Sequence, residues 1–207
     1  MSVAATALDL ARIAPGFADP TTGSQAAFRR IMDAVARPGT IQDLANAPDA
    51  PQGLDRAAGA VALTLFDFET PVWLDPSLRG GVVEDWIRFH CSCPLTEAPA
   101  EAAFAIVTDV AACPPLSSFN PGDAKYPDRS TTLVIQVATL AGGRSASLSG
   151  PGIKTQSAIA PTGLPDSFWD QVQANNARFQ FGVDLLFAAG DLLTALPRST
   201  RVTIKGD

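Results

Sequence analysis

The segment Phe-Ala-Ile-Val-Thr at residues 104–108 is apolar at consecutive positions rather than at alternate ones. Such a strand has no face suited to water, so other elements must cover it on both sides. A second segment, TTLVIQVATL at 131–140, is rich in β-branched residues and predicts another strand. Sheets built from strands of this kind need cover above and below, which is typical of α/β proteins.

Helical and extended patterns alternate along the rest of the chain, with one or two hairpins. The predicted class is therefore α/β, with a mixed β-sheet flanked by helices. The pair Gly142-Gly143 is expected to turn the chain back from the strand at 131–140 into a following strand. Helices are predicted at 24–37, 54–67, 82–90 and 165–179, and strands at 40–44, 71–75, 104–108, 131–140, 144–150, 184–190 and 199–204.

The first and last helices carry the clearest apolar stripes. Ser24 is a suitable N-cap for the first, and Pro38-Gly39 ends it. Spacing of three and four residues places a set of apolar side chains on one face of each helix. The sets are Phe28, Ile31, Met32 and Val35 in the first helix, and Phe168, Trp169, Val172 and Phe179 in the last.

The chain of 207 residues fits one domain, 1–207, with residues 1–16 expected to form a loosely attached arm. Its net charge of −6 argues against nucleic acid as a partner. No apolar run is long enough for a membrane span, and the N-terminus lacks the basic and apolar regions of a signal peptide. Three cysteines, an odd number, fit a reducing cytoplasm.

Charged residues make up only 17% of the chain, against a norm of about 25%. Two explanations remain open. Part of the surface is covered by another subunit, or the composition is simply rich in alanine.

The stretch LSGPGIKT at 148–155 has the glycines expected where a backbone meets a phosphate. An anion site of that kind needs several free backbone N–H groups, and Pro151 removes one of them. Neither known glycine-rich phosphate motif is present. Gly150, Pro151 and Gly152 are therefore predicted to form a structural turn, and the alternative is an anion site served by Lys154.

His90, Cys91, Cys93 and Cys113 include every histidine and cysteine of the chain. Together they have the right atoms for a zinc site, but the spacing is poor, and buried cysteines are commonly just small apolar side chains. No metal is predicted. His90 is the one candidate for histidine-based acid–base chemistry, and its alternative role is to stabilise the end of a helix.

The three lysines, Lys125, Lys154 and Lys205, have no context that argues for a pyridoxal-phosphate Schiff base. No cofactor is predicted. The polar loop 117–131 joins two apolar strands, which is common both for active-site loops and for ordinary surface connections.

Six stretches, taken together and in order, resemble the PhnH family of the bacterial carbon–phosphorus lyase system. They are AFRRIMDAVARPGTI (27–41), RFH (88–90), FNPGDAKYPDRSTTLVIQV (119–137), LSGPGI (148–153), FW with NNARFQFGVDLLF (168–187), and LPRSTRV (196–202). Each is weak alone, but the ordered set spans most of the chain and is specific.

The resemblance implies a fold like that of pyridoxal-phosphate-dependent transferases, without the cofactor site. It also implies a homodimer that joins sister subunits of the carbon–phosphorus lyase complex. That complex converts ATP and an alkylphosphonate into a ribose 1-phosphonate 5-triphosphate, with release of adenine. No catalytic residue carries over from the family. Cations in or beside the matched stretches are candidates to contact an anion or a partner: Arg30, Arg37, His90, Arg129 and Lys154.

Two hypotheses of different classes follow. In the first, the chain is a subunit of a phosphonate-processing complex and is inactive alone. In the second, it is a free-standing α/β enzyme acting on a nucleotide or a phosphate ester. A zinc protein is a third, weaker, alternative.

Overall fold

A six-stranded mixed sheet forms the centre of the molecule, which is known from a computed structural model that describes residues 13–204. The strand order is β1-β8-β7-β4-β3-β2. Four neighbouring strands are parallel: β2 (Val72–Leu74), β3 (Phe104–Val107), β4 (Thr132–Gln136) and β7 (Asp184–Ala189). Two strands are antiparallel to their neighbours: β8 (Leu192–Leu196) and β1 (Gln42–Asp43). This mixed sheet confirms the predicted class.

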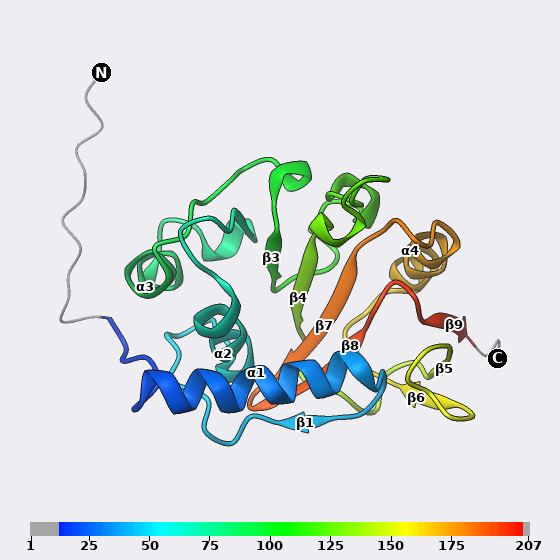
Figure 1. Cartoon of the computed structure of the whole chain (residues 1–207), viewed down its shortest axis with the longest axis horizontal. Coiled ribbons are helices and arrows are strands. Elements are labelled where there is room, and N and C mark those ends of the chain that lie inside the picture. Colours follow the sequence, from blue (N-terminus) through cyan, green and yellow to red (C-terminus); the bar gives the residue numbers. More distant parts are fainter. Residues whose placement is uncertain (1–12, 205–207) are drawn as a thin grey trace.

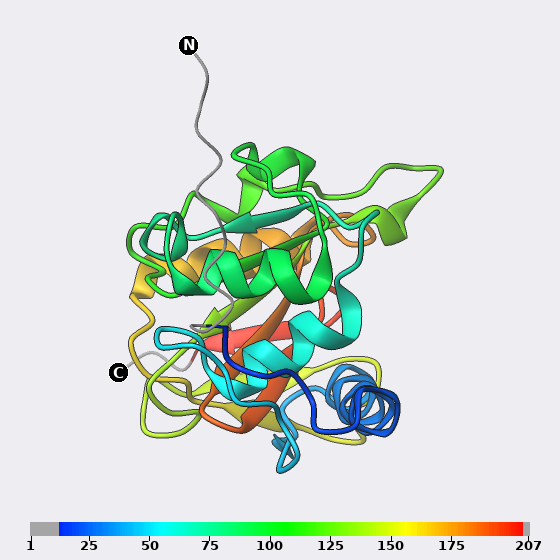
Figure 2. The ribbon, with the colours of Figure 1, turned by 90° about the vertical axis from the view of Figure 1, so that its left-hand side faces the viewer.

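Both faces of the parallel strands are buried, as the consecutive apolar residues predict. In β4, Val134 packs into one apolar core, while Leu133 and Ile135 pack into the other. The first core lies under α1 (Pro20–Ala36), α2 (Arg56–Leu65) and α3 (Val82–Cys91), and the second under α4 (Asp166–Ala177). Figure 1 shows α4 on the opposite side of the sheet from α2 and α3, and Figure 2 shows α3 and α2 in front of the sheet with α1 seen nearly end-on.

A second, three-stranded antiparallel sheet helps to cover the second core. Its order is β6-β5-β9, and its strands are β5 (Ala146–Ser149), β6 (Ser157–Ile159) and β9 (Arg201–Ile204). Leu148 and Val202 of this sheet belong to the same core as Leu133. Short 3-10 turns complete the elements: η2 (Pro76–Leu78), η3 (Pro99–Glu101), η4 (Leu116–Ser118) and η5 (Pro127–Arg129).

The hairpin expected at Gly142-Gly143 is wrong, because β4 and β5 belong to different sheets. Gly143 instead packs against the backbone of residues 160–161. Gly143 donates its N–H to Ala160 O, and a Cβ at this position would lie 2.0 Å from Pro161 O. The close approach of two backbones, rather than strand reversal, therefore requires a glycine here.

The N-cap of the first helix lies five residues earlier than the predicted Ser24. Asp19 is the N-cap, and its carboxylate accepts hydrogen bonds from the N–H groups of Thr21 and Thr22. Pro20 occupies the first helical position, where its missing N–H costs nothing. An aspartate followed by a proline is a stronger start than Ser24, which lies inside the helix.

The apolar stripe of α1 is mostly exposed. Ile31 is buried, but Phe28, Met32 and Val35 are 46%, 49% and 37% exposed. The buried face is made instead by small residues, Ala27 and Ala34, beside Ile31. Small side chains let the helix axis come close to α2 and β8, so the larger side chains are left outside.

The remaining predicted helices are present with shifted ends. In α4, Phe168, Trp169 and Val172 are buried as expected, whereas Phe179 lies past the helix and is 62% exposed. Strands β6 and β8 were not predicted from the sequence. Residues 1–12 of the expected N-terminal arm lie outside the described residues. Beyond them, Ala14 accepts a hydrogen bond from Trp86 Nε1 at 2.9 Å.

Asp75, at the carboxyl end of β2, is only 3% exposed and accepts four hydrogen bonds. The donors are the N–H and hydroxyl of Ser77 and the N–H groups of Thr108 and Asp109. Burial alone would raise the pKa of Asp75, but these hydrogen bonds outweigh it and lower the pKa below its usual value. The charged carboxylate thus joins the ends of β2 and β3.

We expect Asp75→Asn to destabilise the fold by roughly 1–3 kcal/mol at neutral pH, because an amide nitrogen would face donors. Because the pKa of Asp75 is lower in the folded protein than in the unfolded chain, the charged carboxylate stabilises the fold at pH values above its unfolded-state pKa of about 4. This stabilisation is lost as the pH falls through the pKa of Asp75 in the folded protein. The gap between wild type and variant should therefore narrow below pH ~4. Urea unfolding at several pH values measures it, with Asp170→Asn, at an exposed position, as control. A gap independent of pH would contradict the prediction.

Candidate functional site

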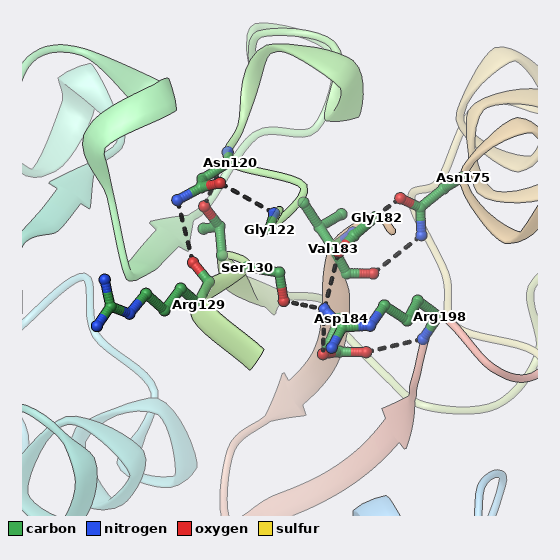
Figure 3. A network of polar contacts seen from close by, with 10 residues as sticks. Asn120, Gly122, Arg129, Ser130, Asn175, Gly182, Val183, Asp184 and Arg198 are labelled. Atoms are coloured by element: carbon green, nitrogen blue, oxygen red, sulfur yellow. Dashed lines mark hydrogen bonds and ion pairs between the residues drawn. The ribbon is translucent and has the colours of Figure 1, made fainter. Parts of the chain in front are cut away.

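Hydrogen bonds hold the loop 119–131 at the amino ends of the parallel strands. Asn120 accepts a hydrogen bond from Gly122 N and donates one from Nδ2 to Arg129 O, at 2.9 and 3.0 Å. The hydroxyl of Thr131 accepts from Asn120 N and donates to Ala102 O. One asparagine therefore joins the two ends of the loop (Figure 3), and Thr131 anchors the loop to the segment before β3.

Arg198 connects this loop to β7. Its Nη1 donates to Ser130 Oγ and to Gly182 O, the latter at 3.0 Å, and lies 3.5 Å from a carboxylate oxygen of Asp184. The backbone N–H of Arg198 also donates to Asp184, at 2.8 Å. The arginine side chain is only 16% exposed, so it is largely committed to these contacts.

Asn175 holds the other side of the same corner. Its side chain donates to Val183 O at 2.9 Å and accepts from Val183 N at 2.8 Å. A Cβ on Gly182 would lie 2.6 Å from the amide oxygen of Asn175, so that contact requires glycine. Figure 3 shows the network running from Asn120 to Asn175 through Ser130, Asp184 and Arg198.

The loop presents two cations beside one aromatic ring. The guanidinium of Arg129 lies 3.9 Å from the centroid of the Tyr126 ring, and Lys125 Nζ lies 5.0 Å from it. Both cationic residues are exposed. In Figure 3 the Arg129 side chain points away from the Asp184–Arg198 pair. Such an arrangement suits an anionic group or an acidic partner surface.

Arg37 and Lys154 lie on adjoining segments. Gly152 packs against the end of α1, where a Cβ would be 2.0 Å from Ala36 O and 3.1 Å from Pro38. Arg37, between those two residues, pairs with Asp33 at 2.7 Å. Lys154 is exposed, two residues after Gly152.

The stretch LSGPGIKT joins β5 to β6 and has the backbone expected of its glycines. Gly150 and Gly152 have φ values of +136° and +77°, where other residues are strained. Gly150 also approaches the segment before β9, since a Cβ would lie 3.1 Å from Ser199 O. The turn is therefore packed against two other parts of the chain.

Arg30 and His90 lie apart from both groups. Arg30 lines a small pocket with Asp43 and Asn46. His90 Nε2 lies 3.0 Å from Ala14 O, and its ring packs against those of Trp86 and Phe89. The structure therefore does not gather the five candidate cations into one site.

The cysteines lie on opposite sides of the sheet. Cys91 and Cys93 belong to the core under α1–α3, while Cys113 packs against the core under α4. Burial raises the pKa of Cys91 and of Cys113 to about 12, so both thiols are protonated at neutral pH. Among residues 13–204, no three His, Cys, Asp or Glu side chains gather as metal ligands.

Comparison with known proteins settles the family. The sequence pattern of the bacterial phosphonate metabolism protein PhnH matches residues 15–203. The chain belongs to the PhnH family. Within residues 13–204, the match covers every helix and every strand except the last residue of β9.

Two relatives of this chain carry names that state a role. The "Alpha-D-ribose 1-methylphosphonate 5-triphosphate synthase subunit PhnH" of Rhizobium meliloti (strain 1021) is 46% identical over 186 residues, covering 90% of this chain and 93% of the relative. The "Putative C-P lyase subunit protein HtxG" of Stutzerimonas stutzeri is 31% identical over 186 residues, which cover 88% of this chain and 87% of the relative. No helix among the described residues is both long and apolar enough to span a membrane.

Of the residues in the network, the sequence analysis singled out Arg129 alone. Arg198, Asp184 and Asn120 all lie in the stretches that resemble the family, but their partners are far away in the chain. One signal was available. Asp184 begins the otherwise apolar strand Asp184–Ala189, and a charge at the start of a buried strand needs a nearby partner.

We predict that Gly152→Ala lowers the free energy of unfolding by more than the ~1 kcal/mol expected for positive φ alone, because its Cβ would meet Ala36 O. Gly163→Ala is a matched control, since Gly163 has φ +78° and nothing within 4 Å of the added Cβ. Equal losses in the two variants would show that the α1 contact contributes nothing. Lys154→Ala should leave the melting temperature unchanged.

We also predict that Arg198→Met destabilises the fold by roughly 1–3 kcal/mol, because Gly182 O and Asp184 lose a charged donor. Arg201→Met, at an exposed position on β9, should change stability by less than ~0.5 kcal/mol. Urea unfolding measures both. Similar effects in the two variants would mean that the network is energetically neutral.

Proposed function

We propose that this chain is a subunit of a carbon–phosphorus lyase system in phosphonate catabolism. Its role is to support formation of a ribose 1-phosphonate 5-triphosphate from ATP and an alkylphosphonate. The observation that carries the proposal is 46% identity, over 90% of this chain, to a relative named as a subunit of such a synthase.

The site geometry supports a role within a complex rather than free-standing catalysis. His90 is engaged with a backbone carbonyl and two aromatic rings, and not with a nucleophile. The thiols of Cys91, which is buried, and of Cys113, which is partly buried, have raised pKa values, and this disfavours the thiolate needed for nucleophilic attack. The exposed cations are spread over three places, which fits contacts with other subunits.

The finer expectations are part of the same proposal. The protein is a cytoplasmic homodimer, and it has the arrangement of a pyridoxal-phosphate-dependent transferase without the cofactor. Lys125 and Lys154 lie in exposed loops, away from the apolar cores that would hold a pyridine ring. Lys205 lies beyond the described residues.

Co-expression tests the subunit role. A tagged chain is produced together with the phosphonate genes that neighbour it, and the captured proteins are identified by mass spectrometry. The proposal requires stoichiometric capture of sister subunits, and deletion of the gene should abolish growth on an alkylphosphonate as phosphorus source. Growth of the deletion strain at the wild-type rate would overturn it.

The isolated chain should turn over neither ATP nor methylphosphonate, because His90, the only histidine of the sequence, contacts a backbone carbonyl rather than a nucleophile. Adenine release is followed by chromatography, with the co-expressed complex as positive control. Adenine release by the purified chain, still present after separation from contaminating nucleosidases, would favour the free-standing enzyme instead.

A further inference from the structure

The exposed stripe of α1 borders an apolar groove. Phe28, Met32 and Val35 form one wall, and the other lining residues include Leu65 of α2, Phe104 of β3 and Pro197, which follows β8. We call this surface the α1 groove. Contiguous apolar surface of this kind is uncommon on soluble monomers and typically marks an interaction site.

The spacing of the wall residues indicates which kind of partner segment can pack into the α1 groove. Phe28, Met32 and Val35 are separated by four and three residues, the pattern of a helix that packs lengthwise against another helix. The three side chains are 37–49% exposed, and the small residues Ala27 and Ala34 hold the opposite side of α1 in the core. The groove is therefore presented by a helix that is already anchored.

Two exposed arginines lie close in the chain to residues that line the groove. Arg29 lies three residues before Met32, one helical turn away on the outer side of α1. Arg129, which is also exposed, ends the turn that leads into Thr132, a residue that lines the groove. Within residues 13–204, neither arginine has a carboxylate within ion-pair distance. The one acidic residue in the lining, Asp184, is already paired with Arg198.

We propose that the α1 groove docks an amphipathic helix of a sister subunit, with an apolar stripe flanked by Asp or Glu. The inference rests on the proposed function, because it takes the chain to be one subunit of a complex. It goes further by assigning the surface and the chemistry of the segment that covers it. Apolar contacts supply the affinity, and the two arginines select the acidic flanks.

A second copy of this chain fits the groove less well. In a two-fold interface the same surface lies on both sides, so a basic edge meets a basic edge whichever way the axis runs. Charge complementarity therefore favours a different, acidic segment over self-association at this face.

The test uses the tagged full-length chain co-expressed with its sister subunits. Met32→Glu places a carboxylate in the apolar wall and should reduce capture of sister subunits at least tenfold. Phe89→Glu is the matched control, because Phe89 is 48% exposed on α3 and lies outside the groove. The double variant Arg29→Glu with Arg129→Glu should reduce capture several-fold, and the loss should be larger at low ionic strength. Far-UV circular dichroism and melting temperature check that each variant is folded.

A photo-crosslinking amino acid at position 32 identifies the occupant. The expected product is a peptide of a sister subunit with apolar residues at helical spacing and flanking acidic residues. A crosslink to a second copy of this chain, with Met32→Glu converting a dimer to a monomer and leaving sister capture intact, would overturn the inference.

The two proposals fail in different ways. If wild type and Met32→Glu capture sister subunits equally, the docking surface is wrong and the subunit role stands. If the wild-type chain captures no sister subunit at all, the subunit role is wrong and the docking surface is wrong with it.

Discussion

The burial of β3 and β4 on both faces is the constraint on which the rest of the fold depends. Residues such as Val134 and Ile135 point in opposite directions, and both are removed from water. The chain must therefore provide two layers of cover. It supplies α1–α3 for one face, and α4 with a separate three-stranded sheet for the other. The need for two covers explains why β5 leaves the main sheet rather than pairing with β4.

Much of this architecture was predictable, because it follows from local pattern. The apolar runs predicted β3 and β4, and the stripe of Phe168, Trp169 and Val172 predicted α4. Other elements depend on distant partners. Strand β6 has only three residues, and β8 is defined by its antiparallel pairing with β7. The exposed stripe of α1 was misread because periodicity shows that a face is apolar, but not whether this molecule or another covers it.

The candidate site shows the same limit. Sequence reasoning chose isolated cations, and the structure separates them into different places. The polar network joins residues remote in sequence, with Arg198 reaching Ser130 across 68 positions. No spacing rule brings those two together. Only Asp184, a charge at the start of an apolar strand, indicated that a partner had to be near.

The two apolar cores contain different tryptophan residues. Trp86 lies in the core under α1–α3, whereas Trp73 and Trp169 lie in the core under α4, and all three are at most 2% exposed. The chain has no other tryptophan. Intrinsic fluorescence therefore reports on each side of the sheet through its own residues. A chain that keeps only Trp86 would show whether its half of the molecule melts together with the other half or ahead of it.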